Sequence, residues 1–138
     1  MDNENIAKAT GRDLPISTKK SIEVCNFIRG LHIKKVKIKL NDVIKQRMAV
    51  PYKRFNKDLG HKKNIMSGRY PIKTCKYILD IIESAEANAK NIGLNTDNLI
   101  ISRIIANKAS RPWRQGRKRR IKMKRTHIEV VVSEVKND

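Results

Sequence analysis

The sequence predicts a mixed α and β fold in which three helices are followed by two antiparallel strands. Between Thr18 and Gly93 the apolar residues recur in three segments at the spacing of amphipathic helices. From Leu99 the spacing changes to two, which is typical of a strand, and this alternation returns after Thr126. A chain of 138 residues is long enough for one domain with one modest core.

The first ten residues are predicted to form a disordered lead, and residues 11–138 to form a single domain. Met1 to Asn5 are polar and acidic, without the basic and apolar segments of a secretory signal. No run of about 18 apolar residues is present, so no membrane span is expected. We therefore expect a cytoplasmic protein.

The first helix is predicted from Thr18 to about Arg29, after a short extended segment over residues 11–16. Ser17 is a residue type that often caps a helix at its start, and Gly30 is one that often follows its end. Pro15 in the extended segment favours an edge strand or the start of a strand.

Two further helices are predicted on the same grounds. The second runs from about Ile33 to Gln46 and combines an apolar face with many lysines. The third and longest begins at Pro71, which is well suited to the first turn of a helix, and ends at Gly93.

In residues 47–70 the apolar residues recur neither at the spacing of a helix nor at the spacing of a strand. The segment is basic and contains Gly and Pro. A stretch of this length without its own secondary structure is usually functional or disordered. We therefore expect a basic surface loop that becomes ordered on a partner.

The two strands, Asn98–Ala106 and Thr126–Glu134, are predicted to pair as a long antiparallel hairpin over residues 103–126, with its turn near Gly116. Between Arg103 and Arg125 this segment contains eleven Lys or Arg side chains and no Asp or Glu. Such an arm repels itself and has no apolar core to join, so we expect it to be loose until it lies against a polyanion.

The net charge of the whole chain is +19, which also indicates a nucleic acid as the partner. Only six residues are aromatic, without the pairing that base-stacking sheets use, so the expected contacts are mostly to phosphate and sugar. Trp113, which no core pattern surrounds, is expected to contact a base, a sugar or an arginine.

Catalysis and cofactor binding have little support in the sequence. The three histidines lie far apart, and no known catalytic or phosphate-loop motif is present. We expect no enzyme activity, no metal and no cofactor, although a small magnesium-dependent nuclease built from scattered aspartates stays open as a rival. Cys25 and Cys75 are predicted to be buried free thiols.

Several stretches, taken in order, form a recognisable set: Gly11–Lys20, Ile28–Gly30, Val50–Asn56, Gly60–His61, Gly68–Pro71, Ala85–Ala89, Asp97–Leu99 and Lys124–Val132. Together they resemble one known family, the universal large-subunit ribosomal protein L twenty-two, named L seventeen in eukaryotes. The resemblance covers about residues 10 to 134, and a loop at 50–61 matches the archaeal and eukaryotic branch. The segment between Ala106 and Thr126 is a few residues shorter than is usual in the family.

The resemblance implies an α+β fold: three helices packed on a small antiparallel sheet, with a long protruding basic β-hairpin. It implies a structural constituent of the large ribosomal subunit that binds 23S-type rRNA and joins several rRNA domains during assembly. The implied hairpin lines the polypeptide exit tunnel. The implied partners are rRNA, neighbouring ribosomal proteins and the nascent polypeptide, with the chain a monomer within the particle and no membrane contact. The alternative is a free-standing basic nucleic-acid chaperone.

The candidate RNA-binding residues share a basic or aromatic side chain and a place near the first helix start, in the basic loop or in the hairpin. They are Lys19, Lys20, Arg47, Lys53, Arg54, Lys57, His61, Lys62, Lys63, Arg69, Lys108, Arg111, Trp113, Arg114, Arg117, Lys118, Arg119, Arg120, Lys122, Lys124 and Arg125.

Overall fold

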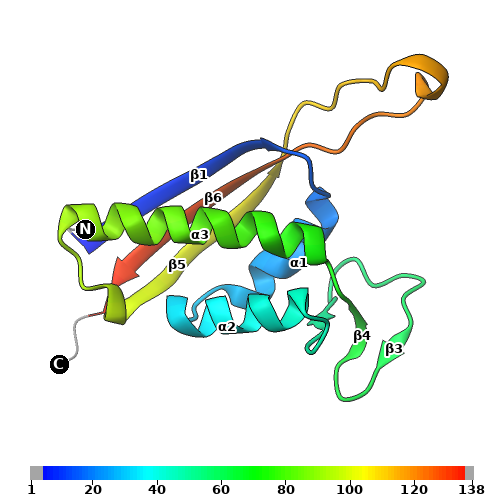
Figure 1. The fold of residues 1–138 in the computed structure, drawn as a ribbon. Coiled ribbons are helices and arrows are strands. Elements are labelled where there is room, and N and C mark those ends of the chain that lie inside the picture. Colours follow the sequence, from blue (N-terminus) through cyan, green and yellow to red (C-terminus); the bar gives the residue numbers. More distant parts are fainter. Residues whose placement is uncertain (1–4, 136–138) are drawn as a thin grey trace.

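The computed structural model describes residues 5–135 and has an α+β fold, as predicted (Figure 1). Its main sheet contains three antiparallel strands in the order β1-β6-β5. The strands are β1 (Ile6–Leu14), β5 (Leu99–Lys108) and β6 (Thr126–Glu134). Strand β6 is therefore the central strand, and it pairs with β1 on one side and β5 on the other.

Three helices form a layer beside this sheet, and their positions confirm the predicted ones (Figure 1). They are α1 (Thr18–Ile28), α2 (Ile33–Ile44) and α3 (Ile72–Ile92). Helix α3 contacts β1 and β6, α1 contacts β5, and α2 packs on α3. Gly93 ends α3 with a φ of +90°, a left-handed conformation that favours glycine.

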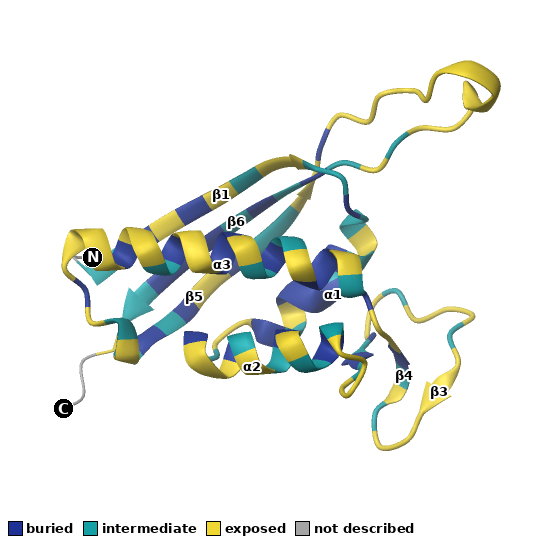
Figure 2. Cartoon of the chain, in the orientation of Figure 1, coloured by how far each residue is buried: buried dark blue, intermediate teal, exposed yellow. Residues whose placement is uncertain are grey.

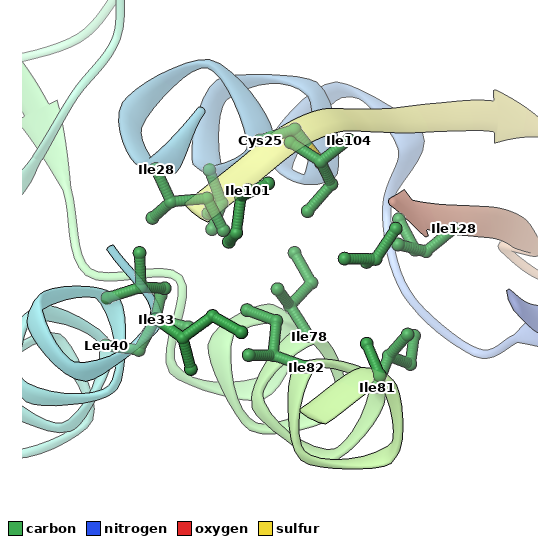
Figure 3. Close-up of a cluster of buried hydrophobic side chains, with 14 of the residues drawn as sticks. Cys25, Ile28, Ile33, Leu40, Ile78, Ile81, Ile82, Ile101, Ile104 and Ile128 are labelled. Carbon is green, nitrogen blue, oxygen red and sulfur yellow. The ribbon is translucent and has the colours of Figure 1, made fainter. Parts of the chain in front are cut away.

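The core lies between the helices and the sheet, where apolar side chains from every layer meet (Figures 2 and 3). Ile28, Ile78, Ile82, Ile101 and Ile128 are all fully buried. Burying one such side chain stabilises a fold by roughly 1.5–3 kcal/mol. This core holds α1, α3 and the hairpin strands in fixed relation, so it sets where the basic segments leave the body.

The predicted disordered lead is wrong for residues 6–10, because β1 already begins at Ile6. Ala7 and Ala9 point into the core, and their strand pairs with β6 through Val132 and Val130. Alternate burial of two small side chains between polar ones gave little apolar signal in the sequence. Residues 1–4 lie outside the described residues.

The expectation of a structureless loop over residues 47–70 is also wrong, because this segment forms a second small sheet. Its strands are β2 (Val50–Pro51), β3 (His61–Lys62) and β4 (Met66–Arg69), in the order β2-β4-β3. Each strand is only two to four residues long. No periodicity can be read from such short strands, which explains why the sequence did not reveal them.

A buried carboxylate ties this segment to the body. Glu23 of α1 is 1% exposed, and its two oxygens accept hydrogen bonds from three consecutive backbone N–H groups. Lys53 N donates to Oε2 at 3.1 Å, while Arg54 N and Phe55 N donate to Oε1 at 2.8 and 2.7 Å. Charge-assisted bonds of this kind are stronger than neutral ones, so Glu23 fixes the turn that presents Lys53 and Arg54.

We expect Glu23→Gln to free this turn, because the new amide nitrogen cannot accept the bond from Lys53 N. The free energy of unfolding should fall by about 1–3 kcal/mol. Hydrogen exchange at the amides of residues 53–55, followed by NMR, should become faster. The exposed Glu83→Gln is the matched control, and its exchange should equal that of the wild type. Unchanged exchange in Glu23→Gln would contradict the assigned role.

The predicted burial of two free thiols is confirmed for Cys25 and Cys75. Burial raises the pKa of each thiol from 9.0 to about 12. Only the thiolate is an effective nucleophile, so neither thiol should react in the folded protein near neutral pH.

Mass spectrometry after iodoacetamide treatment at pH 8 should therefore find both thiols unlabelled in buffer and both labelled in urea. Since the folded pKa lies above the unfolded pKa, the free energy of unfolding should also decline as the pH rises from 9 towards 12. Rapid labelling of the folded protein would show that at least one thiol is accessible.

Candidate nucleic-acid interface

The basic segment forms an arm that leaves the end of the main sheet (Figure 1). Its turn contains a short 3-10 helix at Gly116–Lys118, which agrees with the predicted turn near Gly116. Regular pairing ends at Lys108 opposite Thr126, so the strands are shorter than a fully paired hairpin would require. Beyond that point the two sides are joined by single backbone bonds, such as Arg114 N to Ile121 O at 2.9 Å. All residues from 110 to 122 are exposed (Figure 2).

The arm's charge has no counterpart within the described chain. Between residues 5 and 135 the ion pairs are Lys34–Asp97, at 2.7 Å, and Lys37–Glu86. Neither pair takes a side chain from the predicted RNA-binding set. At close spacing, unpaired like charges raise the energy of the free protein and favour binding of a polyanion.

Trp113 is 58% exposed near the middle of the arm, which agrees with its predicted lack of a core environment. Its backbone bridges to Lys122 on the other side of the arm, and the Nζ of Lys122 lies 4.5 Å from its ring centroid. This cation–π contact stabilises the arm locally. Contact of Trp113 with RNA stays a prediction.

Hydrogen bonds at the root of the arm fix its exit from the body. The buried hydroxyl of Thr126 donates to Ile16 O at 2.9 Å and lies 2.8 Å from the Thr18 hydroxyl. Across the sheet, Arg29 Nη2 donates to Ile104 O at 3.1 Å. These bonds join both strands of the hairpin to α1, and no pattern in the sequence predicted them.

Two hollows flank this root, and together they collect predicted residues from separate segments. One, of about 520 Å³, lies between the start of α1, Phe55 and the arm. Its cations are Lys19, Lys108, Arg111, Lys124 and Arg125.

The second hollow, of about 410 Å³, is also lined by Lys124 and Arg125. It adds Lys20, Arg114 and Lys73, the last from the first turn of α3. Lys73 was not among the predicted residues. Lys73 lies two residues after Pro71, and this place near the start of the helix was the only sequence signal for it.

The predicted residues of segment 47–70 lie on or beside the small sheet, which extends from the same end of the molecule as the arm (Figure 1). The side chains of Arg47, Lys57, His61, Lys63 and Arg69 are exposed there. Every residue of the predicted set is exposed except Lys20 and Arg125, which are half-buried. The basic side chains thus form two groups, one on the arm and its root and one on the small sheet. The two groups meet at Phe55, whose ring centroid lies 5.7 Å from Lys19 Nζ and 5.2 Å from the Arg54 guanidinium.

No helix in the described chain is both long and apolar enough to cross a membrane. The described residues also contain no cluster of three or more His, Cys, Asp or Glu side chains with the arrangement of a metal site.

Comparison with known proteins gives a family match over most of the chain. Residues 9–133 match the family described as ribosomal protein L22p/L17e. A large ribosomal subunit protein uL22 from Methanosphaera stadtmanae is 41% identical, with 96% of this chain and 91% of the relative covered. The uL22 protein of Methanoculleus marisnigri is 37% identical over 98% of this chain and 94% of its own length. The relative from Nanoarchaeum equitans is also 37% identical, and the match covers 97% of this chain and 82% of the relative.

These relatives are archaeal, which agrees with the branch indicated by the loop at residues 50–61. Both the match to the family and the match to the Methanosphaera stadtmanae protein extend over the helices, the small sheet and the arm. The chain therefore belongs to the ribosomal protein L22p/L17e family, which makes it a protein of the ribosome and not an enzyme.

Proposed function

We propose that this protein is a structural constituent of the large ribosomal subunit that binds 23S-type rRNA and joins several rRNA domains. It is located in the cytoplasm, on the ribosome. The arm, in this proposal, passes between rRNA segments and lines the exit tunnel, where it faces the nascent polypeptide. Its other neighbours are rRNA and large-subunit proteins, and the chain acts as one copy in each particle.

The observation that carries the proposal is the exposed, unpaired charge of the arm. Of the eleven cations between Arg103 and Arg125, ten lie on the projection that begins at Lys108, which has no acidic residue and one buried side chain, Ala109. Neutralising RNA phosphates with such cations releases counterions, which supplies most of the binding free energy at low salt. The folded body contributes geometry, because its core determines where the arm and the small sheet meet RNA.

Basic groups that project from the body in two directions suit the joining of different RNA segments better than the coating of one duplex. The arm projects from the sheet while the small sheet projects from the other side of α1 (Figure 1). A free-standing nucleic-acid chaperone, the alternative, would bind any duplex equally. Co-sedimentation with large subunits in high salt separates the two proposals, because a threaded arm is released by salt less readily than a surface patch.

Charge removal at the tip should lower the salt dependence of RNA binding. Replacing residues 117–120 with Ala removes four exposed cations. The slope of log K against log salt with large-subunit rRNA should become smaller by roughly 3, at about 0.7–0.9 per phosphate contact. The melting temperature should hardly change, because these side chains contact no core.

The control for this series is Lys76→Ala with Lys90→Ala, which removes two exposed cations from α3. Its slope should stay close to that of the wild type. If the tip variant unfolds, or if both variants lower the slope equally per charge, the tip is not a specific RNA contact.

The tip should also order only on RNA, since few backbone bonds hold it. In the free protein, backbone NMR relaxation at residues 114–117 should give order parameters below about 0.6, against about 0.85 in the main sheet. The same amides should become as rigid as the sheet in the rRNA complex. A rigid tip in the free protein would show that the arm is held by its own contacts.

A further inference from the structure

We propose that the larger hollow at the arm's root is a binding site for one unpaired nucleotide of RNA. This inference rests on the proposed rRNA-binding function and gives it a specific subsite. The hollow measures about 520 Å³, which is within the range of sites that hold one small ligand. Its walls come from three parts of the chain: α1, the turn at Phe55 and both sides of the arm.

The charge of the hollow favours a phosphate. Five cations line it, and no Asp or Glu is among its lining residues in the described chain. Lys108 and Arg111 come from the outgoing side of the arm, and Lys124 and Arg125 from the returning side. Converging cations with no carboxylate between them repel one another, and an anion placed among them removes that repulsion.

The remaining wall favours a base. Phe55 and Ile22 supply an aromatic ring and an aliphatic side chain, and both are half-buried. A base that has left its stack exposes a flat face, and such faces stack on aromatic rings in RNA-binding proteins. A base inside a double helix has no free face, so the combination of cations and ring selects an unpaired nucleotide.

The backbone that carries the aromatic ring is already held in place without a ligand. Phe55 N donates to the buried carboxylate of Glu23 at 2.7 Å, which fixes the backbone beneath the ring. The guanidinium of Arg54 lies 5.2 Å from the ring centroid, and Arg54 does not line this hollow. Lys19 Nζ, 5.7 Å from the centroid, belongs to an exposed side chain that can turn to a phosphate. A prepared ring of this kind lowers the ordering cost of binding.

The test compares two probes by NMR titration of the whole protein: adenosine 5′-monophosphate and ribose 5-phosphate. They share the sugar and the phosphate and differ only in the base. We expect adenosine 5′-monophosphate to bind at least about fivefold more tightly, the lower limit for one base–aromatic stack. The largest shift changes should lie at Phe55, Lys19 and Lys108.

Phe55→Ala should make the two affinities equal while ribose 5-phosphate binds as before. Phe27→Ala is the matched control, because Phe27 also carries a lysine over its ring, Lys39 at 5.1 Å, but lies outside the hollow. Its preference for the nucleotide should be that of the wild type. If Phe55→Ala does not fold, Phe55→Leu keeps the apolar bulk and should still reduce the preference.

Equal binding of the two probes by the wild type, or shift changes away from the hollow, would overturn the inference. So would a nucleotide preference that survives in the folded Phe55 variant. These outcomes are distinct from failure of the proposed function, which large-subunit rRNA binding measures in the same preparations. A protein that binds this rRNA but does not prefer the nucleotide keeps its function and loses the subsite.

Discussion

The antiparallel pairing of β5 with β6 is the interaction on which the other features of this molecule depend. Strand β6 lies at the centre of the main sheet, so its pairing joins the core, the edge strand β1 and the arm in one ladder. The arm begins where that ladder ends, at Lys108 and Thr126. A highly charged segment with no core of its own can project in a defined direction only because both of its ends are held in this way.

Acidic and basic side chains have different roles in different parts of the molecule. Glu23 is buried and satisfies three backbone amides, so it contributes order to a basic turn and little to the surface potential. The half-buried Glu86 and the exposed Asp97 pair with lysines of α2, and neither pair includes a residue of the arm. The cations at the arm and its root have no acidic partner in the described chain. This distribution leaves the surfaces that we assign to RNA with an uncompensated positive charge.

Much of the fold could be predicted, because long amphipathic segments show their period clearly. The three helices, the hairpin strands and the turn near Gly116 all lie where the sequence indicates. The misses have physical reasons. Strand β1 buries only small alanines at alternate positions, and the second sheet has strands too short to show a period. Glu23 interrupts the apolar stripe of α1, and its partners, the amides of Lys53 to Phe55, are some 30 residues away in the chain.

The sequence by itself determined that the chain is basic, that it has a mixed α and β fold and that its charge is concentrated in one segment. These properties depend on composition and on contacts between residues close together in the chain, and both can be read directly from the sequence. Only the tertiary structure decided that Lys19, Phe55, Lys108 and Arg125 line one hollow. Such a site depends on contacts between residues that are tens of positions apart. Those distances are set by the packing of α1 on the sheet and by hydrogen bonds such as that of Thr126 to Ile16.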